Sequence, residues 1–359
     1  MTKNFYYLIL ILVISVSCKS QQTTDDRELY VGGYVYEQHN IPLKHFIYIK
    51  KDSIFILNND LQIETSGLIQ ETTRDINQKF IKNGNKFSII QTDTASGQFA
   101  DWHYFKATNA PLSKNTFTDK YANKTFSAEI PKTLSSPNRD FNIVKSVVFQ
   151  TDSMDISYEY YYNDKKIYAE KESAPINYFE IDNLLFVSVK NNGIFSRVYQ
   201  ILPKGKGFEM LSYGETLKVI EKYQAKSEAE TSGYNAYSTC LDSRPGEYYH
   251  DDIGYIKGNQ YLLKQIQENA PQSLTGNGYI TVHFTINCQG KVGRFGLEQM
   301  NKKYQSTQFN PELIEYLVNF ITQIDEWENI DTLNNSMYSD AHAFYMFKIE
   351  NGKITDICP

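Results

Sequence analysis

The sequence predicts a mainly β protein that ends in a small α+β domain. Three observations lead to this fold class. The 359 residues include 28 Tyr and 21 Phe, whose side chains favour the pleated, half-buried surface of a sheet. Short β-branched and aromatic runs alternate with polar turns along most of the chain. The C-terminal part adds segments with the period of an amphipathic helix.

The N-terminal residues 1–17 have the composition of a signal peptide. Lys3 precedes the unbroken apolar run Leu8–Ile14, and small residues follow it. An apolar stretch of about ten residues spans roughly 15 Å as a helix, about half of the ~30 Å hydrocarbon core of a bilayer. The segment is too short to be a transmembrane helix, so we expect residues 1–17 to be removed on export.

Cys18 lies in a context that resembles the lipobox of bacterial lipoproteins. The matching residues are Ser15-Val16-Ser17-Cys18, with Ser15 where the motif usually has Leu. The resemblance implies that Cys18 becomes the lipidated N-terminus, joined to the fold by a polar tether, residues 18–29. An ordinary secretory signal with an incidental Cys18 is the alternative. Several acyl chains anchor firmly, since each buried CH₂ contributes about 0.8 kcal/mol.

We expect a lipid-anchored location in the cell envelope, with the outer membrane favoured. Lys19 follows Cys18 in place of the Asp that accompanies inner-membrane retention in lipoproteins. The net charge is −6, or about −7 without residues 1–17, which hold one Lys and no acidic residue. The sequence has no cluster of Lys and Arg residues with which to bind nucleic acid or anionic lipid headgroups. We therefore expect the acyl chains on Cys18 to supply the membrane attachment.

Residues 30–220 are predicted to form a β-rich domain, either an antiparallel barrel or a sandwich. Its two halves, 30–110 and 126–213, share a similar rhythm of short strands and polar turns. Residues 221–245 contain few aliphatic side chains and are predicted to be a linker. The strand-like runs are residues 45–51, 53–58, 86–92, 102–107, 144–150, 154–163, 166–172, 178–190 and 195–205.

Residues 246–359 are predicted to form the small α+β domain. Tyr279–Asn287 alternates apolar and polar residues as a half-buried strand does, and a tight turn leads into a second strand, Val292–Met300. The other predicted elements are a helix at 260–269, a helix beginning at Pro311 after the N-cap Asn310, and a hairpin of 343–349 and 353–357 around Asn351-Gly352.

This ββαβ order resembles the C-terminal domain of the TonB family. The matching segments are residues 278–295, 309–317 and 344–349, with Trp327 after the helix and 261–271 in the place of that domain's first helix. The resemblance covers about residues 255–359 and implies protein contacts by strand addition to a sheet edge. A cleavable signal and scattered prolines do not fit an energy transducer, so we expect protein binding or a structural role instead.

Three cysteines remain after Cys18, and an oxidising envelope permits one disulfide among them. In the TonB-like arrangement, Cys288 ends the first strand and Cys358 ends the closing hairpin. If those strands are antiparallel neighbours, Cys288 and Cys358 form the disulfide. Cys240 is the competing partner for either of them. The bond is expected to contribute on the order of a few kcal/mol.

No local motif predicts a catalytic, cofactor or metal site. The His-Asp-Asp run at 250–252, with Glu247, is the densest group of ligand types, but adjacent side chains do not point one way and a solvated loop is the better interpretation. Asp101 and His103 share one face of a strand without a nucleophile. His283 lies on the polar face of its strand, exposed or covered by the domain's own helix.

The function that follows is non-catalytic. We expect an envelope lipoprotein that binds another envelope protein or serves as a structural module, without a cofactor. The alternatives are a carrier of a small apolar ligand inside a lipocalin-like β-barrel formed by residues 30–213, and a hydrolase whose site leaves no local signature.

Overall fold

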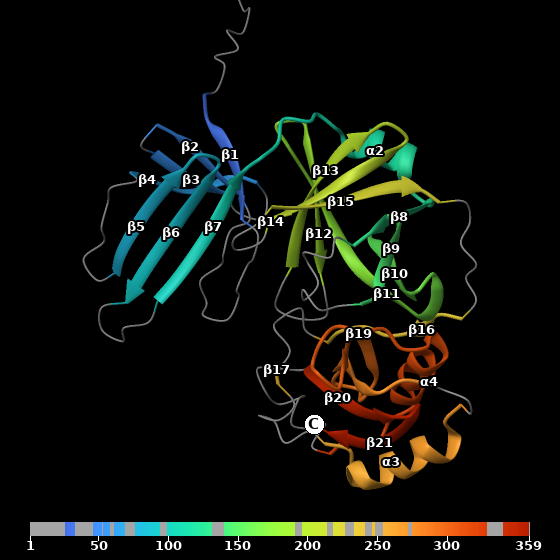
Figure 1. Ribbon diagram of the computed structural model, residues 1–359. Coiled ribbons are helices and arrows are strands. Elements are labelled where there is room, and N and C mark those ends of the chain that lie inside the picture. Colours follow the sequence, from blue (N-terminus) through green and yellow to red (C-terminus); the bar gives the residue numbers. More distant parts are fainter. Residues whose placement is uncertain are drawn as a thin grey trace, which may run out of the picture.

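The computed structural model describes most of the chain. Within the described ranges the fold is mainly β, as predicted, with three sheets and three helices. Figure 1 shows the first sheet beside a ring of strands, and the third sheet with two helices at the other end of that ring. The described residues are 26–32, 46–51, 53–57, 61–68, 76–93, 99–130, 140–190, 196–213, 218–226, 233–240, 246–247, 254–271, 275–328 and 340–358.

The first sheet has seven antiparallel strands in the order β4-β3-β2-β1-β7-β6-β5. Tyr30, Ile47 and Phe87 form a buried cluster on one face, whereas Leu29 and Val31 on the other face pack against the second sheet. Strands buried on both faces show nearly continuous apolar runs. These strands are β1 (Glu28–Gly32), β2 (Phe46–Lys50), β3 (Ser53–Leu57), β4 (Ile63–Leu68), β5 (Ile76–Asn83), β6 (Lys86–Asp93) and β7 (Phe99–Lys106).

The second sheet closes on itself. Each strand from β8 to β15 pairs antiparallel with the next, and β15 pairs with β8, so eight strands form a ring. The two-residue β16 (Asn235–Ala236) lies parallel to β11, outside the ring order. The ring strands are β8 (Thr125–Glu129), β9 (Asn142–Phe149), β10 (Ser153–Tyr162), β11 (Lys165–Ile181), β12 (Leu184–Lys190), β13 (Ser196–Lys204), β14 (Gly207–Tyr213) and β15 (Lys218–Ala225).

Aromatic side chains fill the interior of the ring. Phe208 is fully buried, and its ring centroid lies 5.9 Å from Phe117, 5.3 Å from Tyr121 and 5.7 Å from Phe149. Phe117 and Tyr121 belong to α2 (Lys114–Tyr121), a helix that joins the first sheet to the ring. These edge-to-face contacts add to the free energy gained by burying the rings. The interior is therefore a packed core.

The same interior holds one charged pair. Lys145 Nζ donates to Glu221 Oε2 at 2.9 Å, and Tyr223 Oη donates to this oxygen at 2.6 Å. Burial acts to lower the pKa of Lys145, but Glu221 and the nearby tyrosine hydroxyls outweigh it and hold this pKa well above its ordinary value. Because each charge is satisfied by the other, the pair is tolerated inside the ring.

The third sheet has the order β17-β20-β18-β19, with β21 also paired to β20. As predicted, Asn310 caps α4 by accepting the Glu312 N–H at 2.8 Å, and Pro311 fills its first position. The core between sheet and helices continues into the β10–β11 hairpin through Tyr160 and Tyr168. The elements are β17 (Gly246–Glu247), α3 (Gly258–Asn269), β18 (Gly278–Ile286), β19 (Val292–Asn301), α4 (Pro311–Thr322), β20 (Ala341–Glu350) and β21 (Lys353–Cys358).

Both segments predicted to be connections contain strand residues. β1 starts at Glu28, within the predicted tether 18–29, and β15 continues to Ala225, within the predicted linker 221–245, which also contains β16. The second difference has a physical cause: Glu221 and Tyr223 enter the ring as satisfied polar side chains, so this strand needs few aliphatic residues. The division into domains stays a prediction.

Replacing Phe208 by Ala is expected to destabilise the protein by about 3–5 kcal/mol, because a cavity is left among the surrounding rings. Ile220, 38 % exposed on β15 of the same ring, is the matched control, and Ile220→Ala should cost less than about 1 kcal/mol. Denaturant unfolding of the two variants measures the difference. Equal losses of unfolding free energy would contradict the packed interior.

Candidate functional site

The structure pairs Cys240 with Cys288, with an S–S distance of 2.01 Å and a Cα–Cα distance of 6.0 Å. The preferred pairing, Cys288 with Cys358, is wrong, and the competing partner is the correct one. Cys358 is exposed at the end of β21 and takes no part in the disulfide. In the chain-entropy view, closing the 48-residue separation contributes about 4 kcal/mol.

The order of the strands explains the error. β20 lies between β18, which Cys288 follows, and β21, which Cys358 ends. Two strand spacings of about 4.8 Å exceed the Cα–Cα reach of roughly 7 Å that a disulfide allows. The segment that ends at Cys240 instead lies beside the end of β18. Asn287 Nδ2, just after β18, donates a hydrogen bond to Ser238 O at 2.9 Å.

Other predicted positions are only partly described. Cys18 and the run 250–252 lie outside the described residues, as does the side chain of Glu247. On β7, His103 Nδ1 lies 2.9 Å from Ser88 Oγ. His283 is half-buried on the face of β18 opposite to α4, and its ring stacks with that of His342. The domain's own helix therefore does not cover it.

A second buried charged contact joins β19 to β11. Arg294 Nη1 donates to Glu170 Oε1 at 3.0 Å, its Nη2 donates to Glu172, and its guanidinium lies 4.1 Å from the ring centroid of Tyr158. Tyr160 Oη also donates to Glu170, at 3.0 Å. Burial raises the pKa of the Glu170 carboxyl above its ordinary value, and Arg294 opposes that rise.

The backbone at this contact is specialised. Arg294 has a φ of 56°, in the left-handed region, and its N–H donates to Glu170 Oε2 at 3.0 Å. A Cβ at Gly293 would lie 2.5 Å from Tyr237 Cγ and 2.6 Å from Glu170 Oε2. Only glycine permits this close approach, so Gly293 and Arg294 together dock the third sheet on the ring.

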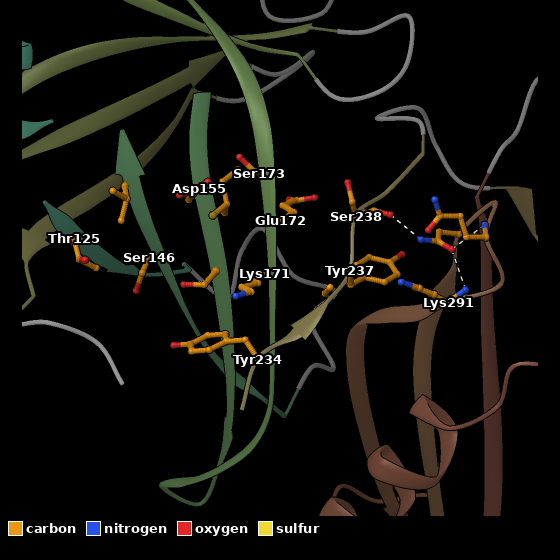
Figure 2. A pocket seen from close by; sticks show the side chains of 16 residues that line it. Thr125, Ser146, Asp155, Lys171, Glu172, Ser173, Tyr234, Tyr237, Ser238 and Lys291 are labelled. Atoms are coloured by element: carbon orange, nitrogen blue, oxygen red, sulfur yellow. Dashed lines mark hydrogen bonds between the residues drawn. The ribbon is translucent and has the colours of Figure 1, made fainter. Parts of the chain in front are cut away.

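A pocket of about 560 Å³ lies between the ring and the segment that carries the disulfide. Figure 2 shows Thr125, Ser146, Asp155 and Lys171 on ring strands at one side, with Lys291 on the other. Its lining comes from β8 to β11, from residues 234–238 and from the turn after β18. The full lining is Thr125, Ser146, Val148, Asp155, Ile156, Ser157, Lys171, Glu172, Ser173, Tyr234, Ala236, Tyr237, Ser238, Asn287, Gln289 and Lys291.

β21 is a second candidate for binding. It pairs with β20 alone among the described strands, so its other edge is not paired within them. On that strand Ile354 O accepts a hydrogen bond from Gln267 Nε2 of α3 at 2.9 Å. Lys353, Thr355 and Asp356 are exposed. An edge strand that is paired on one side only can present its remaining backbone groups to another chain.

The sequence did not point to the pocket. Its wall residues lie far apart in the chain and meet only through strand pairing. Ser146 is a polar residue in the predicted strand 144–150, and this was the one sequence feature that could have indicated the pocket. Its chain neighbours Lys145 and Val147 point into the ring. In the described part of the chain no group of three or more metal-ligand side chains is arranged to hold a metal, and no helix has the length and apolar character to cross a membrane.

Replacing Arg294 by Ala is expected to destabilise the protein by about 3–5 kcal/mol near neutral pH, because Glu170 is left buried without its cation. Loss of the cation raises the pKa of Glu170 further above the ordinary value of 4.5. When the pKa of a carboxyl is higher in the folded than in the unfolded protein, the protonated carboxyl favours the folded state at low pH. This stabilisation is lost as the pH rises through the folded-state pKa. The deficit should therefore be small at about pH 4 and largest at about pH 8.

Unfolding measured at the two pH values checks this, with Lys165→Ala as control. Lys165 forms a partly exposed ion pair with Glu315, which should be worth about 1 kcal/mol or less. Adding Glu170→Gln to Arg294→Ala should remove most of the pH dependence. A deficit that does not change with pH would contradict the role given to Glu170.

Comparison with known proteins leaves the chain without an assigned family. No protein-family model matches it, and no curated protein matches it.

Proposed function

We propose that this protein is a non-catalytic envelope lipoprotein, held on the outer membrane by lipid on Cys18, that binds another envelope protein through its C-terminal α+β part. The edge of β21 that no other described strand pairs carries the proposal. Strand addition to such an edge supplies main-chain hydrogen bonds, and side chains at alternate positions supply specificity. The disulfide is consistent with an oxidising compartment.

The resemblance of residues 255–359 to the TonB C-terminal domain supports the same proposal. The order helix, strand, strand, helix, strand that it implies is the order of α3, β18, β19, α4 and β20. β21 follows as an additional strand and forms the open edge. Energy transduction is not proposed, because the sequence pattern lacks a motor-coupled transmembrane helix and a Pro-rich spacer.

The packed ring is the reason for preferring protein binding to carriage of an apolar ligand. A carrier needs an apolar cavity inside the ring. Phe208, Phe117 and Tyr121 occupy that space, and the pocket lies on the other side of the ring wall. The buried ionisable groups Arg294 and Glu170 are paired with each other, which gives them a structural role.

The anchor is tested by Cys18→Ser. This variant is expected to lose incorporation of a labelled fatty acid and to leave the membrane fraction, because no basic surface replaces the lipid. Cys358→Ser is the matched control and should remain labelled and membrane-bound. Membrane attachment of the Cys18 variant would contradict lipidation at this residue.

The binding edge is tested with a photoreactive amino acid at Asp356, exposed on β21. Illumination of whole cells is expected to give a discrete adduct with another envelope protein, because a strand added to β21 lies within reach of this side chain. Asn142, exposed on β9 of the ring, is the control position and should give no such adduct. Adducts from both positions, or from Asn142 only, would contradict binding at this edge.

A further inference from the structure

The hairpin that leads into β21 decides which backbone groups its outer edge, the edge away from β20, presents. The chain turns through Asn351 and Gly352, which have left-handed φ values of 50° and 75°. A two-residue turn of this type makes its flanking residues, Glu350 and Lys353, a hydrogen-bonded pair. Ile354, the next residue, belongs to a pair of the other type, so its N–H and C=O point away from β20.

A bulge changes the spacing of the outward groups further along β21. The register shifts between Lys348 and Ile349, so that β21 has one residue more than β20 in this stretch. Ile357 pairs with Phe347, which lies two residues from Ile349 and so forms the same type of pair. The outward groups of β21 therefore come from Ile354 and Ile357, three residues apart. A regular partner strand presents its groups at every second residue and cannot match both.

Two side chains already bond to these outward groups. Gln267 belongs to α3, which packs beside β21 (Figure 1), and its Nε2 donates to Ile354 O at 2.9 Å. Asp356 Oδ1 accepts the Ile357 N–H at 3.0 Å. One acceptor and one donor of the outer edge are thus occupied from within the protein. A strand that pairs with these groups must displace both side chains.

Proteins limit edge-to-edge association with bulges, with charged side chains on the edge, and with helices that cover it. β21 combines all three, since it is bulged, Lys353 and Asp356 are exposed on it, and Gln267 reaches it from α3. We propose that Gln267 and Asp356 protect the β21 edge: they prevent copies of this protein from associating through it, and a partner strand binds by displacing them. Displacement by a partner rests on the proposed function, whereas protection from self-association does not.

The two hydrogen bonds are strong enough to discriminate between strands. A net hydrogen bond changes an equilibrium by roughly two- to twelvefold, because groups that lose a partner regain bonds to water. Displacing two of them weakens strand addition by roughly five- to a hundredfold. Such a factor suppresses a weak contact between two identical edges. A specific partner compensates for it with side-chain contacts of its own.

Photocrosslinking in whole cells tests the protection, with the photoreactive amino acid at Lys353. This residue is exposed at the start of β21, and its replacement leaves Gln267 and Asp356 in place. Two copies of the full chain with different tags are co-expressed, so an adduct that carries both tags reports self-association. The parent protein is expected to give no doubly tagged adduct. The double variant Gln267→Met, Asp356→Ala lacks both bonds and should give this adduct at least about fivefold above the parent.

Three variants show whether the adduct depends on the edge. Gln265→Met is the matched substitution on the same helix, where it removes a bond to Glu268, and should give no doubly tagged adduct. Asp356→Asn keeps an oxygen that can accept the Ile357 N–H and should behave as the parent does. Phe208→Ala destabilises the ring without touching β21. A doubly tagged adduct from the parent, from Gln265→Met or from Phe208→Ala would overturn the proposal.

The melting temperature separates protection from a purely structural role. If Gln267 and Asp356 serve only the stability of the fold, the double variant melts at a lower temperature than the parent and gives no new adduct. That result would overturn the proposal. A doubly tagged adduct from a double variant that melts within a few degrees of the parent would support it.

The adduct with another envelope protein is read from the same samples. It should be at least about fivefold stronger in the double variant, because the partner no longer has to displace two side chains. A partner adduct of unchanged strength would overturn the displacement. Absence of a partner adduct from every variant would contradict the proposed function alone, since the doubly tagged adduct still decides whether the edge is protected from self-association.

Discussion

The guanidinium of Arg294 is the contact on which the arrangement of the ring and the third sheet depends. It leaves β19, reaches two carboxylates of β11, and lies over the ring of Tyr158. A buried charge without a partner costs several kcal/mol, so β11 and β19 are stable in contact and not apart. The glycine before it allows the two backbones to meet closely enough for this pairing. These two adjacent residues add a specific polar contact to the hydrophobic core that the ring hairpin and the third sheet share.

The length of β11 allows one strand to belong to the ring and also to contact the third sheet. One edge of this strand pairs with β10 over Lys165–Pro175, and the other edge pairs with β12 over Ile176–Ile181. The β10–β11 hairpin therefore continues past the end of the β11–β12 pairing. The part paired with β10 carries Glu170 and Tyr168 to the third sheet, and its other edge pairs with β16. One strand therefore contributes to the packed ring, to the docking contact and to the wall of the pocket.

Local sequence patterns were sufficient to predict most elements. The Asn310-Pro311 cap, the hairpin at Asn351-Gly352 and the aromatic strands are encoded by residues that are neighbours in the chain. Ring closure is different, because the pairing of Phe126 on β8 with Ala225 on β15 joins residues far apart in the chain and has no local signature. The α2 helix was not predicted, since its eight residues contain a short apolar pattern only. The disulfide and the lining of the pocket likewise required the strand order, which the sequence pattern does not contain.

The disulfide also has a consequence for how the chain matures. If the chain is exported with its N-terminus first and Cys18 carries the proposed lipid, Cys240 and Cys288 are the first free thiols to emerge, before Cys358. The native bond thus joins consecutive thiols, so oxidation in the order of emergence gives the correct pairing without later exchange. The loop that it closes contains α3 and β18, whose proximity is secured before β20 and β21 arrive. The late position of Cys358 keeps its thiol out of that reaction.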